Sequence, residues 1–257
     1  MTVDFSKITE APGLQVTQDQ LDRIFHRYHF AKEFCKEKDV VEIACGSGIG
    51  LGYLSTFSTS VVAGDIDEKN IAVAGKQYSS NPKIKIQKTD AHELPYADNS
   101  CDVVLLYEAI YYLQNPEKFI KESWRILRNE GILIIGTVNR EWNDFHPSPY
   151  THKYFSSAEL HGLLSEKFSD IKTFGAFETE QGFKATIFSL IKKAAVNLDL
   201  IPGSLKLRAY LKRIFIGKTF PLPDEIYEGI AEYQEPIQLN SSQRVTTFKI
   251  LYAVGKK

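Results

Sequence analysis

Val40-Val41-Glu42-Ile43-Ala44-Cys45-Gly46-Ser47-Gly48-Ile49-Gly50 is the stretch that decides the fold. Its first half is rich in β-branched residues, which favour a buried strand, and its second half is a glycine loop. Glycine has no Cβ, so such a loop can turn sharply and lie close to a ligand. The residues that follow, 49–57, predict a helix whose free N–H groups point back at the loop. A strand, a glycine loop and a helix in this order predict a nucleotide-binding α/β domain.

Acidic residues around the loop indicate which ligand it takes. Glu42 ends the strand four residues before Gly46, where it disfavours a pyrophosphate and favours an ammonium or hydroxyl group. A second predicted strand, 61–64, leads into Asp65, and an acid about 20 residues after a glycine loop is placed to accept ribose hydroxyls. The glycines follow G-x-G-x-G, whereas the dinucleotide pattern G-x-G-x-x-G requires glycine at Leu51. The loop therefore fits an adenosine compound better than a dinucleotide.

Composition narrows the class of protein. The chain has 257 residues, 43% of them hydrophobic and 25% charged, with a net charge of -1. These values are typical of a globular protein, and the near-neutral charge argues against a nucleic-acid partner. Residues 1–10 lack the apolar stretch of a signal peptide. Cys35, Cys45 and Cys101 are scattered, which predicts reduced thiols in a cytoplasmic protein and no metal site.

The remaining pattern predicts the order of helices and strands. Apolar residues recur at helical spacing or in short buried runs separated by turn residues. Predicted helices cover about 17–38, 49–57, 68–78, 116–128 and 157–167, and predicted strands cover about 40–43, 61–64, 83–87, 101–107, 132–138, 170–177 and 244–254. No helix follows the last strand, so we expect it to run antiparallel. The fold class is thus α/β, a Rossmann-like doubly wound sheet of seven strands.

About 65 residues separate strands six and seven, which is too long for a hairpin turn. We therefore expect a helical lid, residues 181–242, inserted into a core made of 1–180 and 243–257, with 1–38 as its N-terminal helical segment. If strand six is parallel, this insertion emerges over the active site. Its basic, apolar first half could face an anionic sugar nucleotide, a lipid-linked acceptor or a membrane surface, or simply pack on the core.

Several of these motifs together resemble the class I S-adenosylmethionine-dependent methyltransferase family. Residues 42–48 are similar to its first motif, and Asp65 matches the acid that ends the second strand. Residues 90–104 and 124–131 resemble its later motifs, so the likeness covers about 20–177 and the last strand. Ala44 departs from the pattern, because the family usually has glycine there. A methyl group is tolerable at this position if the backbone keeps strand geometry.

The resemblance implies S-adenosylmethionine as cofactor and assigns roles to individual residues. Glu42 would hold the ammonium group, Asp65 the ribose hydroxyls and Asp90 the adenine amino group. Arg27, Tyr28 and His92 could contact the ligand or could instead pack or face solvent. The complete cofactor-binding set expected is Arg27, Tyr28, Glu42, Ala44, Gly46, Gly48, Asp65, Ile66, Asp90, Ala91, His92 and Tyr107.

Methyl transfer is an in-line displacement in which the protein mainly aligns the reactants. A hydroxyl acceptor must also lose a proton, for which a histidine or a carboxylate serves. His146 is the first candidate, followed by His152 in the same loop, with Glu108 and Tyr111 on the opposite wall. Each of these also fits a substrate hydrogen-bonder or a surface residue.

The favoured hypothesis is an enzyme that methylates a hydroxyl group of a sugar or another natural product. A second hypothesis is a cofactor-binding protein that has lost catalysis and binds a partner. A third, a nicotinamide-dependent oxidoreductase, is disfavoured by the glycine spacing and by Glu42. The acceptor, the methylated atom and the oligomeric state stay open at this stage.

Overall fold

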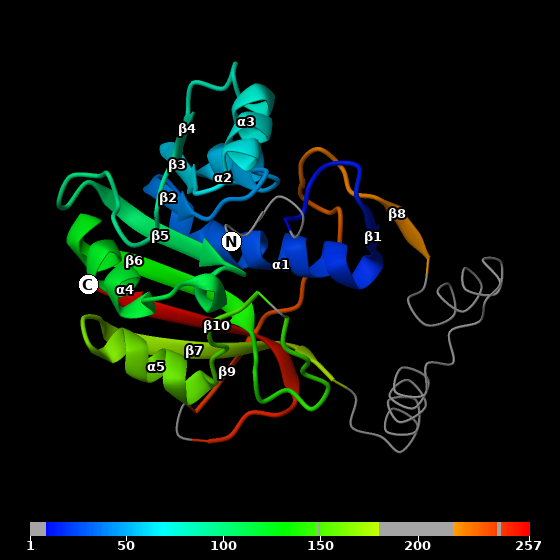
Figure 1. Ribbon diagram of the computed structural model, residues 1–257, viewed down its shortest axis with the longest axis vertical. Coiled ribbons are helices and arrows are strands. Elements are labelled where there is room, and N and C mark those ends of the chain that lie inside the picture. The colour runs from blue at the N-terminus through cyan, green and yellow to red at the C-terminus, as the bar shows by residue number, and fades with distance from the viewer. Residues whose placement is uncertain (1–8, 149, 180–217, 241–242) are drawn as a thin grey trace.

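The computed structural model describes residues 9–148, 150–179, 218–240 and 243–257. Its main element is an eight-stranded sheet in the order β4-β3-β2-β5-β6-β10-β7-β9 (Figure 1). The strands are β2 Asp39–Ile43, β3 Ser60–Asp65, β4 Ile84–Lys88, β5 Cys101–Tyr107, β6 Leu127–Val138, β7 Ser169–Glu178, β9 Ile237–Gln238 and β10 Phe248–Lys256. A separate two-stranded sheet pairs β1 Gln15–Thr17 with β8 Thr219–Pro221.

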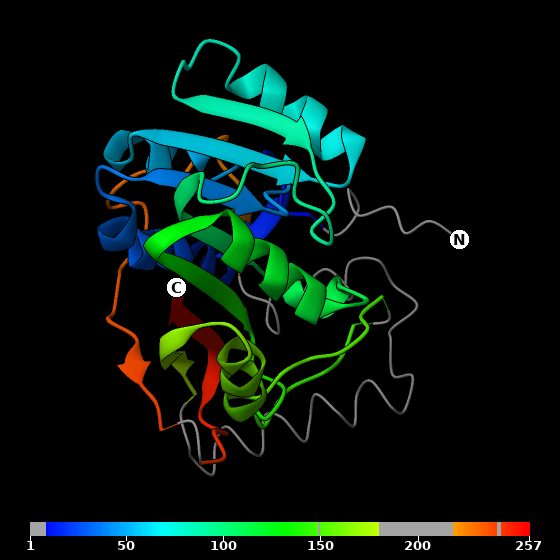
Figure 2. The same ribbon diagram turned by 90° about the vertical axis from the view of Figure 1, so that its left-hand side faces the viewer.

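Helices cover both faces of the large sheet (Figure 2). They are α1 Gln18–Cys35, α2 Leu51–Phe57, α3 Glu68–Gln77, α4 Pro116–Ile126 and α5 Ser157–Ser165. The central strand β5 explains the two layers, because successive side chains of a strand point to opposite faces. Val103 and Leu105 pack with α1 and α2, while Val104 and Leu106 pack with α4 and α5. A strand that is buried on both faces must be apolar throughout, as β5 is.

The seven predicted strands are all present, with the expected direction of the last one. β10 lies between β6 and β7 and is antiparallel to both. β7 is therefore parallel to β6, so its carboxyl end lies at the same edge as those of β2 to β6. The expected number of seven strands was too low for the described part of the chain, because β9 adds an eighth. With only two residues, β9 leaves no pattern in the sequence.

The first half of the predicted helical lid, residues 181–217, lies outside the described residues, whereas residues 218–240 of its second half are described. β8 pairs antiparallel with β1, and Leu222 and Ile226 are buried in the same cluster as α1 and α2. Further along, the carbonyl of Gln234 bonds His26 on α1 at 2.8 Å. Residues 218–240 therefore run along α1 before β9 joins the edge of the sheet. The division into core and lid stays a prediction.

Local sequence features account for where two of the helices begin. Ser156 and Glu159 form the capping box that begins α5, and Pro116 opens α4. All three cysteines are free and buried. Among the described residues, no helix combines the length and apolarity needed to cross a bilayer. No cluster of histidine, cysteine or acidic residues suited to a metal ion is found in that same part of the chain.

Candidate active site

A cavity of about 430 Å³ lies where β2, β3 and β5 end. Glu42, Asp65 and Asp90, which end or closely follow three parallel strands, all line it. The carboxyl ends of parallel strands meet at one sheet edge, and the crevice there is the usual ligand site of open α/β folds. The lining also includes most of the other residues expected from the sequence, namely Arg27, Tyr28, Ala44, Gly46, Ile66, Ala91, His92, Tyr107, Glu108 and Tyr111.

The glycine loop turns through residues with positive φ. Gly46 has φ 58° and Gly48 has φ 82°, values that glycine adopts without a steric penalty. The Gly46 N–H donates to Asp65 Oδ2 at 2.9 Å, which ties the loop to the end of β3. Gly48 is not part of the cavity lining, and its carbonyl accepts a hydrogen bond from Tyr78 at 2.9 Å. Gly48 therefore shapes the turn from behind the cavity wall.

Ala44 also lies in the left-handed region, with φ 56°. The condition that the backbone keeps strand geometry there is not met, because β2 ends at Ile43 and the chain turns at the next residue. A left-handed conformation costs an alanine roughly 1–2 kcal/mol. This cost explains why the related motif has a glycine at this place.

Glu42 is buried, with only 1% of its surface exposed. The Tyr28 hydroxyl donates to its Oε1 at 2.7 Å, while its Oε2 has no hydrogen-bond partner among the described residues. Burial raises the pKa of Glu42 to about 7, against the opposing effects of Tyr28 and Arg27. Tyr28 thus both packs in the core and holds the carboxylate that lines the cavity.

The two other acids are held by backbone N–H groups. Asp65 accepts from Gly46 and, through Oδ1, from Asp67 at 2.8 Å, while burial raises its pKa. Partial burial alone would raise the pKa of Asp90. Hydrogen bonds from the backbone and ring of His92 outweigh this effect, so the pKa of Asp90 is lowered. The His92 ring nitrogen Nδ1 lies 2.7 Å from Asp90 Oδ1. His92 therefore orients Asp90 as well as lining the cavity.

Helix α1 supplies one wall, and it carries residues that sequence reasoning missed. Gln20 and Arg23 line the cavity together with Arg27, which they precede by seven and four residues on the same helix face. This spacing was readable in the sequence. Arg27 is buried and forms an ion pair with Glu10 through Nη2, whereas its Nε has no partner among the described residues. The alternative of a solvated Arg27 is therefore excluded.

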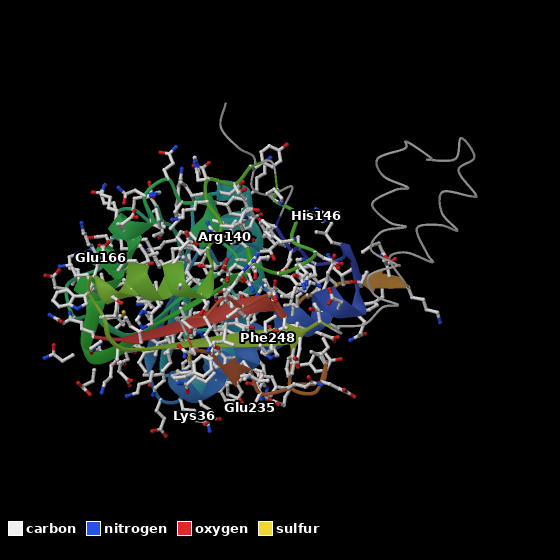
Figure 3. The ribbon with its side chains drawn as sticks, turned by 90° about the horizontal axis from the view of Figure 1, so that it is seen from below. Lys36, Arg140, His146, Glu166, Glu235 and Phe248 are labelled. Atoms are coloured by element: carbon white, nitrogen blue, oxygen red, sulfur yellow. The ribbon has the colours of Figure 1, made fainter. Side chains whose placement is uncertain are left out.

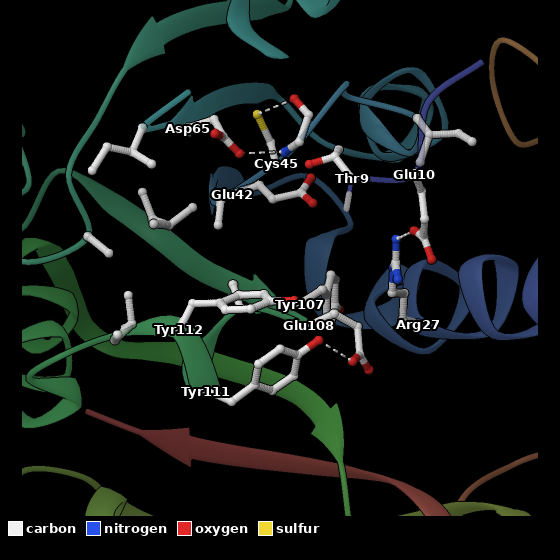
Figure 4. Close-up of a pocket in the computed structure, with 18 of the residues that line it drawn as sticks. Thr9, Glu10, Arg27, Glu42, Cys45, Asp65, Tyr107, Glu108, Tyr111 and Tyr112 are labelled. Carbon is white, nitrogen blue, oxygen red and sulfur yellow. Dashed lines mark hydrogen bonds and ion pairs between the residues drawn. The ribbon is translucent and has the colours of Figure 1, made fainter. Parts of the chain in front are cut away.

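The far end of the cavity is built around Glu108, directly after β5. Its φ is 50°, and the Tyr111 hydroxyl donates to its Oε2 at 3.0 Å (Figure 4). Burial raises the pKa of Glu108, while nearby Arg27 and Arg23 act in the opposite direction. Tyr112, a further residue that the sequence analysis missed, lies beside this pair and also lines the cavity. A carboxylate and phenol groups therefore line the same part of the cavity.

His146 does not reach this end of the cavity, contrary to expectation. It is exposed and lies outside the cavity lining (Figure 3). The rings of Phe145 and Tyr154 pack at 4.7 Å, and Tyr154 packs on Tyr111 at the same distance, so the apolar side of this loop faces the cavity wall. His152 is likewise absent from the lining.

Comparison with known proteins agrees with this geometry. The family described as "Methyltransferase domain" matches residues 41–135, from β2 into β6. A probable S-adenosylmethionine-dependent methyltransferase of Mycobacterium tuberculosis is 31% identical over 148 residues, which cover 56% of this chain and 53% of that protein.

Residues 41–135 are therefore a methyltransferase domain. The chain spans about half the length of the Mycobacterium relative, so the match concerns the domain and not that whole protein.

Two other similarities extend beyond the matched residues of this methyltransferase domain. A malonyl-[acyl-carrier protein] O-methyltransferase of Marinomonas sp. is 27% identical over 64% of this chain and 65% of that protein. The structure of the YcgJ protein of Bacillus subtilis superposes with a TM-score of 0.59 at 15% identity, over 91% of this chain and 98% of that chain. At this identity the superposition shows the fold alone.

Proposed function

We propose that this chain transfers the methyl group of S-adenosylmethionine to an oxygen atom of a small molecule. One observation carries the proposal. Two buried polar atoms, Glu42 Oε2 and Arg27 Nε, have no partner among the described residues, and both side chains line one cavity. Buried polar atoms without a hydrogen bond are rare in folded proteins and call for a ligand. One atom accepts and the other donates, as an ammonium and a carboxylate on the same ligand would require.

The electrostatics of Glu42 support a cationic ligand. A carboxyl group with a pKa of about 7 is only partly charged at neutral pH in the unliganded protein. An ammonium group near Oε2 would favour the charged form, since an opposite charge lowers the pKa of a carboxyl group. In this assignment Glu42 and Arg27 bind the amino-acid end of the cofactor, and Tyr28 keeps Glu42 in place.

The opposite end of the cavity suits a nucleoside. Asp65 would accept from the two ribose hydroxyls, and Asp90 from the adenine amino group, with the Ala91 N–H beside a ring nitrogen. Ile66 is 49% exposed although it is a large apolar residue at the cavity wall. An apolar side chain held open in this way would cover one face of the adenine. The backbone at Gly46 would lie against the ligand, and Tyr107 and Glu108 would flank the reacting centre.

When bound, the cofactor supplies an electrophilic methyl group. The chain must then position the acceptor and remove its proton, and Glu108 is the proposed base. Its raised pKa makes its carboxylate a stronger proton acceptor than an ordinary glutamate, and the Tyr111 hydroxyl orients that carboxylate. Oxygen as the methylated atom is also suggested by the name of the Marinomonas relative. A sugar or another natural-product hydroxyl is the proposed acceptor.

The surroundings of the site complete the proposal. Residues 181–242 would cover the acceptor, because β7 ends at the same sheet edge as the cavity. This segment is also the candidate for contact with a lipid-linked acceptor or a membrane surface. Three free, buried cysteines suit a reducing compartment, so the cytoplasm is the proposed location.

Isothermal titration with S-adenosylhomocysteine and with NADH tests the cofactor. The wild type should bind the first and not the second, and Asp65→Asn should weaken binding by roughly 10- to 100-fold through lost charged hydrogen bonds. Asp98→Asn, which removes an exposed carboxylate from an ion pair with Arg125, is the matched control and should bind normally. Labelled methyl transfer to a panel of phenols, sugars and carboxylic acids then tests the reaction. Failure to bind S-adenosylhomocysteine would overturn the proposal.

A further inference from the structure

Thr9 and Glu10, just before the N-terminal turn, lie inside the cavity and contact the glycine loop (Figure 4). The Ser47 hydroxyl donates to the Glu10 carbonyl at 2.7 Å, and Asn70 Nδ2 donates to Thr9 Oγ1 at 3.1 Å. The Thr9 methyl group lies only 2.7 Å from where a Cβ on Gly46 would be. The segment is therefore held on the loop by specific contacts of both residues, with the Glu10 carboxylate directed to Arg27.

We propose that Glu10 occupies, in the unliganded protein, the position on Arg27 that the carboxylate of the cofactor's amino-acid end takes. Thr9 and Glu10 then form an internal occupant of the cofactor site, which the cofactor must displace. This inference rests on the proposed function, because it presumes a ligand with an amino-acid end.

The charges of the cavity leave no second place for a carboxylate. Its lining carries five carboxyl groups against two guanidinium groups, from Glu10, Glu42, Asp65, Asp90, Glu108, Arg23 and Arg27. Arg23 is already paired with Asp19 at 3.1 Å. Arg27 is more buried than Arg23, with 11% against 27% of its side chain exposed, and its Nε has no partner among the described residues. It is therefore the cation assigned to a ligand carboxylate, and Glu10 holds its Nη2. A bidentate pair with the free Nε would require both nitrogens, so Glu10 and the ligand compete.

Glu10 is the partner that can leave. Its side chain is 37% exposed, whereas that of Arg27 is 11% exposed. On moving outward, Glu10 regains water, while a buried Arg27 left alone would be strongly destabilised. The cofactor carboxylate fills that gap, so the exchange leaves no unpaired charge in the cavity.

The chain just after Thr9 and Glu10 is held by the inserted segment. The Leu222 N–H donates to the Leu14 carbonyl at 2.8 Å, and Gly13 donates to the Leu222 carbonyl at the same distance. These bonds anchor residues 13–14, three to four positions after Glu10.

Titration of Glu10→Gln with two nucleosides tests the exchange. S-adenosylhomocysteine carries the amino-acid end, and 5′-methylthioadenosine is the same nucleoside without it. The variant removes the competing charge, so we expect S-adenosylhomocysteine to bind about 5-fold more tightly or better. Binding of 5′-methylthioadenosine should change less than about 2-fold, since it does not use Arg27. Glu33→Gln, which breaks an exposed ion pair with Lys36, is the control and should leave both affinities unchanged.

Each other outcome has a distinct meaning. Weaker binding of S-adenosylhomocysteine to Glu10→Gln would show that Glu10 contacts the ligand and would overturn the exchange. Equal binding by variant and wild type would also overturn it. In both cases wild-type binding of the two nucleosides would leave the proposed function standing. If the wild type bound neither nucleoside, the proposed function itself would fail.

Discussion

Replacing Glu42 with glutamine should stabilise the unliganded protein above neutral pH. The pKa of this carboxyl group is raised from 4.5 to about 7, chiefly by burial. Between these values the unfolded chain has lost the proton that the folded chain keeps, so the free energy of unfolding falls as pH rises. A shift of this size costs about 3 kcal/mol once the pH exceeds both pKa values. The cost is absent below the unfolded pKa and complete above the folded one.

Glutamine removes this pH-dependent cost and retains an oxygen for the Tyr28 hydroxyl. Its amide N–H groups lack a partner, which costs roughly 1 kcal/mol at every pH. The variant should therefore be about 2 kcal/mol more stable than the wild type above neutral pH and slightly less stable near pH 4.5. S-adenosylhomocysteine should bind it more weakly, because the neutral amide no longer pairs with an ammonium group.

His26 gives the wild type an opposing pH dependence. Burial lowers its pKa from 6.5 to about 4, so the unfolded chain holds the extra proton between these values. Stability due to His26 is therefore complete above pH 6.5 and is lost as the pH falls. In the wild type this rise with pH offsets the fall due to Glu42. In Glu42→Gln the rise should become visible.

Urea unfolding of both proteins from about pH 5 to about pH 8 measures the effect. Asp65 and Glu108, whose pKa values are also raised, act in the direction of Glu42 in both proteins. The difference between variant and wild type isolates Glu42. A difference that stays constant over the whole range would refute the reasoning, because it would mean that Glu42 titrates normally.

Three further predictions concern turnover and backbone geometry. Glu108→Gln should lower turnover by about 10²- to 10⁴-fold in the labelled transfer assay, as expected for loss of a base. The affinity for S-adenosylhomocysteine should stay unchanged. Weaker binding would instead mean that Glu108 contacts the ligand. Ala44→Gly should raise the free energy of unfolding by up to about 1 kcal/mol, since relief of the left-handed alanine exceeds the added freedom of glycine; a loss of stability in urea would contradict this. Gly50→Ala would place a Cβ 2.1 Å from the Tyr28 ring and should cost about 1–3 kcal/mol, whereas the control Gly75→Ala has open space and should be neutral or stabilising by thermal unfolding.

The part of the cavity lined by Glu42, Asp65 and Asp90 was predictable because these residues follow one contiguous pattern. A parallel strand brings its carboxyl end to the sheet edge whatever the rest of the chain does, so three acids at or within two residues of the ends of β2, β3 and β4 had to meet. The glycine loop between the first two acids adds a local signal that needs no tertiary information. The same rule placed Glu108 at the end of β5.

Another part of the cavity lining depends on segments that only the fold brings together. Gln20 and Arg23 lie on α1, Val138 ends β6 and Ile250 lies near the start of β10, yet all four line the same cavity. No spacing in the sequence relates α1 to β10. The prediction that His146 reaches the cavity was wrong for a related reason. The packing of Phe145 on Tyr154 decides the orientation of its loop.

Two non-glycine residues of the cavity lining have left-handed backbone conformations, and they explain why the cavity opens where it does. β2 and β5 are neighbours in the sheet but lead to opposite sides, since β3 follows on one side of β2 and β6 on the other side of β5. Ala44 and Glu108 each follow one of these strands directly and have φ values of 56° and 50°. A left-handed residue turns the chain out of the strand direction at once, so the two connections part and leave a crevice between them. Such a conformation is costly for any residue other than glycine and persists where the surrounding structure enforces it. At Glu108 the Gly136 carbonyl accepts its N–H at 2.8 Å and Tyr111 holds its carboxylate, so the strain fixes a charged group at the cavity wall. At Ala44 no polar group is gained, and this is why glycine there should cost the protein nothing in ligand binding while making it more stable.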